Sequence, residues 1–538
     1  MKKIMKSFLC CLLLTLLVAS FSVNTFALPI SDDVGDHYIY NYFGKAIEAP
    51  VAYRPADMIN YQELNLSENF EPVDLFVQGE YLYILNRAGN SVIVLNQNYQ
   101  KVKEITSIVP TAEEPIPELD NKIIDENGNT TVDPDMEKAS KYQFNSPNGL
   151  YVDEDGIIYV ADTNNRRVVA CDINGNAKNI IRVTKVSVLG TNYIFKPLKL
   201  VVDTGGGLQV IAYAVNRGLM QIDEDGTFRQ FAGAPKVSIN AVEWFWRKLA
   251  TEEQKKQLVT YVPTEYNNIT VDERGFLYTT ISTLDPDTLK GVISSKDNSG
   301  KTTPVLRLNS AGLDTLRRKG VYPPVCDLEF DGENSPQVAD VAVHGNNIFT
   351  LLDGRTGRFF TYDNDGNLLY MGGGSGSQFG KLKTPTSIVA WNNQIIVSDT
   401  ELKAIVVYQA TEYAQLINEA VIAGSTGQYE LSEEKWSEVL KYNSGLYIGY
   451  IGMGKAEMRI ANVLYDDSRL EHYEKALTYF SSANEKDNYS TAFTELQRSQ
   501  LQENFGLIFI SIIVVVVGLF VLYFVVKYRK KKKGRGVN

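Results

Sequence analysis

The sequence predicts a mainly β protein: a six-bladed β-propeller, followed by an α-helical module and one transmembrane helix. Three observations predict this order. A short meander of β-strands recurs six times between residues 72 and 408, helical periodicity replaces it after Tyr408, and an uncharged apolar run follows at 507–526. Because one meander cannot bury both of its faces, recurring meanders close radially into a propeller.

The clearest copy of the meander spans residues 146–172. Its first part, Gly149-Leu-Tyr-Val152, alternates in the way of a strand, since successive side chains of a strand face opposite sides. The segment Asp153-Glu-Asp-Gly156 predicts a tight turn, because Asp and Gly accept positive φ. Two further strands separated by a polar turn follow to Cys171. The unit is therefore a small antiparallel meander.

The other copies share the plan of this first strand. The six predicted first strands lie at 72–77, 147–152, 197–202, 266–271, 338–343 and 385–390. The copy at 146–172 resembles the NHL repeat, on Pro147, Asn148-Gly149, Val152-Asp153, Gly156, Tyr159 to Thr163, Asn165-Arg166 and Val168. The resemblance implies a six-bladed NHL propeller over about residues 38–408. It says little about chemistry, because this architecture hosts hydrolases, lyases and binding platforms.

The N-terminal segment carries the marks of export. Residues 1–27 read as a signal peptide, with a basic start, an apolar stretch and a small-residue cleavage site at Ala27. We expect the propeller to span 28–410, with Tyr38 to Phe43 as the strand that completes the last blade and leaves no free sheet edge. Only Cys171 and Cys326 remain after the signal peptide, a low content typical of export from a Gram-positive bacterium.

Two insertions interrupt the blades, at 101–142 and 240–262. The first is rich in Glu, Asp and Pro, and around 125–129 it predicts an acidic β-hairpin, since it lacks the spaced carboxylates and final Glu of an EF-hand loop. The second predicts a short helix that is capped again at Thr251. Its Trp244 and Trp246 either pin this helix on the propeller or stack against a ligand such as a sugar ring.

Residues 411–505 predict stacked helices. Trp436, Val439 and Leu440 share one face, and Gly449, Gly452 and Gly454 suit close helix packing. The segments Trp436 to Leu440 and Tyr473 to Leu477 resemble tetratricopeptide repeats, which implies a module that holds another protein. We expect the closed propeller to fold without these helices, so that each part unfolds in its own transition.

The end of the chain predicts a membrane anchor. The run 507–526 has the length and composition of a transmembrane helix, and the tail 527–538 carries seven basic residues and no acidic one. This asymmetry predicts a single-pass protein of the cell membrane, with the N-terminal part outside and the tail in the cytoplasm, near anionic lipid headgroups. The net charge of −11 argues against nucleic-acid ligands and permits neutral glycans, cations and proteins.

Aligning the six first strands places six residues at one position facing the central channel. They are Asp74, Gly149, Lys199, Asn268, Asp340 and Ser387. We predict ligand binding at the channel mouth by Asp74, Lys199, Asn268 and Asp340 together with Trp244 and Trp246. The residues that end the second strands, Asn86, Asp162, Asp353 and Asp399, are interpreted instead as partners of backbone amides in turns.

The sequence contains too few of the residues that most enzyme classes need in their active sites. A zinc site needs several His, and only His344 of the three His lies within a clear blade. We predict no catalytic residues and no bound metal. The function expected is a membrane-anchored extracytoplasmic binding and scaffold protein that docks a membrane partner, with carbohydrate uptake as a context. The alternative is a calcium-dependent, gluconolactonase-like hydrolase built on Asp74, Asn268 and Asp340, for which a matching Glu is missing.

Overall fold

The structure is a computed structural model that describes residues 37–124, 130–136, 139–183, 186–190, 193–203, 205–234, 265–332, 334–345, 348–464 and 468–533. The predicted signal peptide, Trp244 and Trp246 lie outside these residues. Contacts between Cα atoms join these described residues into one compact unit.

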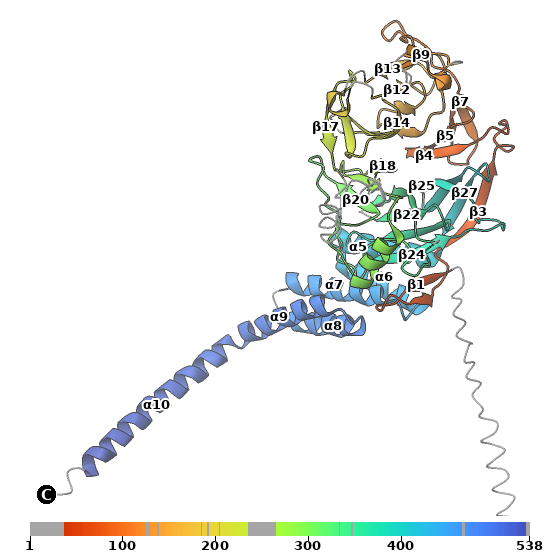
Figure 1. Ribbon diagram of the computed structural model, residues 1–538. Helices are drawn as coiled ribbons and strands as arrows, with labels where there is room; N and C mark the ends of the chain where they lie inside the picture. The colour runs from red at the N-terminus through yellow and green to blue at the C-terminus, as the bar shows by residue number, and fades with distance from the viewer. Residues whose placement is uncertain are drawn as a thin grey trace, which may run out of the picture. The chain divides into compact units, whose positions relative to one another are not determined.

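Six antiparallel sheets follow one another along the chain and surround a central axis (Figure 1). The blades are β4–β7 (Pro72–Gln78, Tyr81–Asn86, Ser91–Leu95, Lys101–Ile105), β10–β13 (Gly149–Val152, Ile158–Asp162, Arg167–Cys171, Ala177–Ile181), β14–β17 (Pro197–Val202, Leu208–Ala212, Leu219–Ile222, Phe228–Ala232), β18–β20 (Asn268–Val271, Leu277–Thr280, Val305–Leu308), β21–β24 (Val338–Val343, Phe349–Asp353, Arg358–Tyr362, Leu368–Gly373) and β25–β27 with β3 (Pro385–Trp391, Gln394–Asp399, Ala404–Ala410, Tyr53–Asn60). The first strands of successive blades contact one another around the whole ring, from β4 to β25 and back to β4. The predicted six-bladed propeller is confirmed.

The strand that closes the ring is β3, not the predicted segment Tyr38 to Phe43. Strand β3 pairs with β27 of the last blade, from Tyr53 opposite Ala410 to Asn60 opposite Ala404. Strand β1 (Tyr38–Tyr40) pairs instead with β2 (Ala46–Glu48) in a hairpin of its own. The hydroxyls of Tyr38 and Tyr40 both donate to the buried carboxylate of Asp327. These bonds hold β1 against the segment before the fifth blade, where it cannot extend the sixth.

A small hairpin and a short helix lie in connections between strands of the propeller. Strands β8 (Lys122–Ile124) and β9 (Thr130–Val132) pair antiparallel, which confirms the hairpin predicted in the first insertion. A helix that the sequence analysis does not predict, α4 (Pro286–Ser295), lies between β19 and β20. Its cap, Asp285 accepting from Thr288 N, and Pro286 in its first turn are standard start signals. The 3₁₀ turns η1 (Pro134–Met136) and η2 (Ser187–Leu189) lie in the connections around the second blade.

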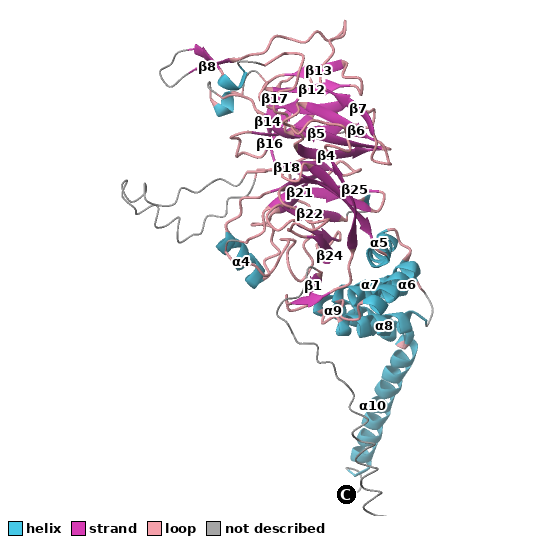
Figure 2. Cartoon of the chain, turned by 90° about the vertical axis from the view of Figure 1, so that its right-hand side faces the viewer, coloured by secondary structure: helices cyan, strands magenta, loops and turns pink. Residues whose placement is uncertain are grey.

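After the propeller come helices α5 (Glu412–Ser425), α6 (Tyr429–Tyr442), α7 (Tyr447–Val463), α8 (Ser468–Ser482) and α9 (Lys486–Glu503). Each packs on the next, and Figure 2 shows them side by side. Glycines on α7 permit this: a Cβ on Gly452 would lie 2.2 Å from Trp436 Nε1, and one on Gly454 would lie 2.6 Å from the Phe480 ring. The predicted close packing at these small residues is confirmed.

The helices share a hydrophobic core with the last two blades. Helix α5 starts directly after β27, and the Thr411 hydroxyl between them donates to Val51 O at 2.7 Å. One buried cluster contains side chains of the β1–β2 hairpin, of both blades and of the helices: Ile39, Leu352, Phe359, Val406, Tyr408, Ile417, Trp436, Ile448 and Met453. Such a continuous core favours a single unfolding transition over the two that the sequence analysis predicts.

The last described element is α10 (Phe505–Lys533). Its segment Phe505–Lys530 has a mean hydropathy of 3.2 and no part of its apolar window is buried. By length and composition this helix could cross a membrane, and the predicted span 507–526 lies within it.

Candidate functional site

Four of the six residues predicted to bind a ligand line one cavity on the propeller axis. The cavity has a volume of about 130 Å³ and takes its wall from the first strands of all six blades. Asp74 comes from β4, Lys199 from β14, Asn268 from β18 and Asp340 from β21. With Ser387 and Gly149 these residues form what we call the channel ring. The structure thus brings Asp74, Lys199, Asn268 and Asp340 together as the alignment of the blades predicts.

The channel ring joins neighbouring blades through backbone amides. Asp74 Oδ2 accepts from Leu150 N of the second blade at 2.7 Å, and Asp340 Oδ2 accepts from Ile388 N of the sixth at 2.8 Å. Ser387 Oγ accepts from Leu75 N at 3.1 Å, which ties the last blade to the first. Each of these three side chains therefore reaches the inner strand of the next blade.

The ring also holds three charged groups. Lys199 Nζ lies 2.6 Å from Asp74 Oδ1, so that this pair spans from the third blade to the first. Burial raises the pKa of Asp74, which Lys199 opposes. Burial raises the pKa of Asp340 to about 7, Lys199 lowering it and Asp74 raising it further. The Ser387 hydroxyl donates to Asp340 Oδ2 at 2.7 Å.

The two remaining ring positions differ from the charged ones. Asn268 is 3% exposed, and its Oδ1 accepts from Ile269 N at 2.8 Å. Its Nδ2 has no hydrogen-bond partner among the described residues. At Gly149 a Cβ would lie 2.5 Å from Leu198 O, so only glycine lets the third blade approach this closely. Among the described residues, Asn268 therefore brings one free amide donor to the cavity.

These residues do not fit a calcium ion. Calcium takes about six to eight oxygen ligands. Asp74 is bound to Leu150 N and Lys199, and Asp340 to Ile388 N, Ser387 and, through Oδ1, Val341 N at 2.6 Å. The ammonium of Lys199 also repels a divalent cation at this place. Among the described residues no group of three or more His, Cys, Asp or Glu is arranged to hold a metal.

The polar side chains that end second strands accept from backbone amides in turns, as predicted. Asp399 accepts four backbone N–H groups: Lys383 at 2.6 Å, Thr384 at 2.9 Å, Glu401 at 3.0 Å and Leu402 at 2.8 Å. Asp353 accepts from Gln337 N and Arg355 N, and Asn86 from Glu71 N and Gly89 N. Asp162 accepts from Asn145 N and lies 2.7 Å from the fully buried Arg167. None of these four borders the channel cavity.

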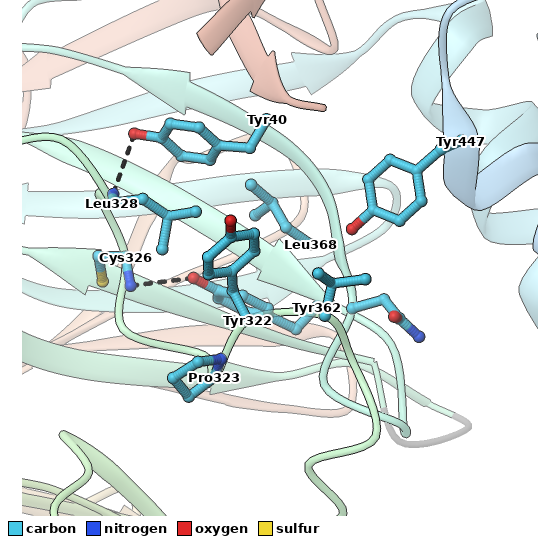
Figure 3. A pocket seen from close by; sticks show the side chains of 10 residues that line it. Tyr40, Tyr322, Pro323, Cys326, Leu328, Tyr362, Leu368 and Tyr447 are labelled. Atoms are coloured by element: carbon cyan, nitrogen blue, oxygen red, sulfur yellow. Dashed lines mark hydrogen bonds between the residues drawn. The ribbon is translucent and has the colours of Figure 1, made fainter. Parts of the chain in front are cut away.

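A second, smaller cavity of about 20 Å³ lies where the β1–β2 hairpin, the fifth blade and α7 meet (Figure 3). Tyr40, Tyr322, Tyr362 and Tyr447 line it. Tyr362 Oη accepts from Cys326 N, and Tyr40 Oη accepts from Leu328 N, both at 3.0 Å. The sequence analysis does not find this cavity, because its side chains come from segments far apart in the chain. The bond from Leu328 N to Tyr40 holds the β1–β2 hairpin in place, which is a structural role.

Comparisons with known proteins bear on the fold. The NHL repeat family matches residues 144–171, which hold β10 to β12 of the second blade. Virginiamycin B lyase from Staphylococcus aureus is similar in structure, with 12% identity and a TM-score of 0.37, over 67% of this chain and 100% of that chain. The PQQ-bound aldose sugar dehydrogenase from Streptomyces coelicolor follows with 9% identity and a TM-score of 0.35, over 68% of this chain and 99% of that chain.

BamB from Moraxella catarrhalis has 11% identity and a TM-score of 0.23, over 62% of this chain and 71% of that chain. The comparison with curated proteins gives no match. The chain thus contains an NHL repeat within a propeller of six blades. Similarities this distant assign no activity, ligand or partner to it.

Proposed function

We propose that this chain is a membrane-anchored extracytoplasmic binding and scaffold protein. Its propeller holds a ligand in the channel, and its helices dock a membrane partner, with carbohydrate uptake as the context. One observation carries this proposal: a single hydrophobic core runs from the last two blades into the helices, and the last of them, α9, is followed directly by the apolar helix α10. A ligand-bearing body would thereby be held close to the bilayer.

The proposed orientation rests on the distribution of charge around α10. Basic residues follow the apolar run at once, beginning with Lys527 and Arg529, and Lys or Arg next to a span favours the cytoplasmic side. Protease added to intact cells should therefore digest the propeller and spare an epitope tag on the tail. Loss of the tag while the propeller survives would reverse the orientation.

The docking surface proposed for the partner is the outer face of α9. Tyr489 and Phe493 are stacked there with ring centroids 6.4 Å apart, and Phe493 is 43% exposed. Ala492 and Leu496, which lie next to this pair on the helix, are buried, so the two rings stand at the border of the packed stripe. An exposed aromatic pair beside a membrane anchor favours contact with a protein, since such residues are enriched at interfaces.

The docking proposal can be tested in native membranes. A photo-crosslinking amino acid at Phe493 should capture a membrane protein, whereas the same group at the exposed Thr491, on another face of α9, should not. The double variant Tyr489→Ala/Phe493→Ala should lose the copurified partner. Equal capture from both positions, or none from either, would remove the support for a docking face on α9.

The alternative of a calcium-dependent hydrolase gains no support from the channel ring. The side-chain oxygen atoms of its candidate residues Asp74, Asn268 and Asp340 already bind Lys199, Ser387 and backbone amides. A calcium ion would need about six to eight oxygen ligands, and these three side chains beside the ammonium of Lys199 do not supply that number.

A further inference from the structure

The channel ring contains more buried negative than positive charge. Asp74 is paired with Lys199, whereas Asp340 forms no ion pair with any described residue and is bound by Ser387 and two backbone amides. Asp340 is 5% exposed. A buried carboxylate without a cationic partner is unfavourable, so it either takes up a proton or awaits a positive charge.

The cavity beside Asp340 has room and chemistry for such a partner. Beyond the ring its wall is apolar apart from Thr270, with Phe76, Val77, Val271 and Val343. Asp340 Oδ1 accepts only from Val341 N, so a second donor can reach it, because each carboxylate oxygen can accept about two hydrogen bonds. On the neighbouring strand β18, the Nδ2 of Asn268, which has no partner among the described residues, offers a donor to an oxygen.

We propose that the channel cavity binds a small hydroxylated amine, an amino alcohol or amino sugar, with its ammonium group on Asp340 and a hydroxyl oxygen on Asn268. The inference rests on the proposed function, whose channel site it makes specific. An ammonium brings the charge of the ring to zero. An anion would add to the excess negative charge, and a neutral sugar would leave Asp340 unpaired.

Three matched compounds test the inference: 2-aminopropane-1,3-diol, glycerol and glycerate. They are a cation, a neutral molecule and an anion on the same three-carbon frame. Calorimetry on the full chain in detergent micelles at pH 7 should show the amine binding at least about tenfold more tightly than glycerol, with no binding of glycerate.

Binding of the amine should also release protons. Asp340 faces Asp74 on β4, Lys199 on β14, Asn268 on β18 and Ser387 on β25, and with a pKa of about 7 it is about half protonated at pH 7. The ammonium favours the ionised carboxylate and lowers this pKa, so the bound proton leaves. Titration in buffers of different ionisation enthalpy measures that release, and glycerol should cause none.

Two variants and a control test whether amine binding and proton release depend on Asp340 and Asn268. Asp340→Asn should abolish both the preference for the amine and the proton release, and Asn268→Ala should weaken the amine about tenfold while its proton release persists. Glu154→Gln removes one charge from an exposed turn and should change neither. If Asp340→Asn does not fold, the proton release of the unaltered chain and Asn268→Ala still decide.

Equal affinity for the amine and glycerol, or binding without proton release, would overturn the inference while the proposed binding function stands. No binding of the amine would overturn it as well. Crosslinking from Phe493 tests the scaffold role separately, so the two failures are distinguishable.

Discussion

The channel ring and the junction between blades and helices use buried side chains in opposite ways. At the junction, Trp436, Phe359 and Tyr408 fill one apolar cluster. In the channel ring, polar side chains border a cavity, and Asp340 has no ionic partner among the described residues. A fully packed apolar cluster joins the two modules into one body, whereas polar side chains around a cavity leave hydrogen-bonding groups that a ligand could use.

The largest expected effect comes from breaking the junction. Trp436 is 3% exposed and packs on Gly452, so Trp436→Ala should lower the free energy of unfolding by about 3–5 kcal/mol. Circular dichroism during urea unfolding of the full chain measures this. Lys441→Ala, at an exposed position of the same helix, should change it by less than about 0.5 kcal/mol. Similar losses from both variants would mean that Trp436 is not a core residue.

The second largest loss of unfolding free energy is expected from removing the buried carboxylate of Asp399. Asp399→Ala leaves four backbone N–H groups without their acceptor, and we expect it to cost about 2–4 kcal/mol. The same urea titration applies. A loss below about 1 kcal/mol would show that water replaces the carboxylate and that the turns do not depend on it.

A further effect is expected in the channel ring, and it depends on pH. The pKa of Asp340 is raised to about 7 in the folded chain, above its unfolded value of about 3.9. The stabilising contribution of protonated Asp340 is therefore complete below about pH 4. It is lost as the pH rises to about 7. The free energy of unfolding should fall over that window relative to Asp340→Asn. A constant difference between the two proteins from pH 4 to 8 would contradict the raised pKa.

The sequence predicts the parts of the fold that repeat. The inner strands alternate regularly, so their shared polar position correctly places Asp74, Lys199, Asn268 and Asp340 around one channel. Strand β3 escapes prediction because its residues Arg54 to Asp57 are exposed and show no alternation. Their pattern suits an outer strand with Pro55 at its edge, where a missing amide costs little.

Partners across the ring could not be predicted. The pair of Lys199 with Asp74 joins the third blade to the first, and the bond from Ser387 to Asp340 depends on how the blades meet. The shared core of propeller and helices was missed for a related reason. Trp436 and Phe480 show helical periodicity, but that pattern does not tell which neighbour covers each face.

The most direct test of the central claim is the number of unfolding transitions. Calorimetry of the full chain in detergent micelles, with and without Trp436→Ala, reports whether blades and helices unfold together. We expect one transition that shifts as a whole to lower temperature in the variant, because the cluster around Trp436 includes both modules. Two transitions, of which only one moves, would show that the propeller is independent of the helices and would contradict a single body of blades and helices.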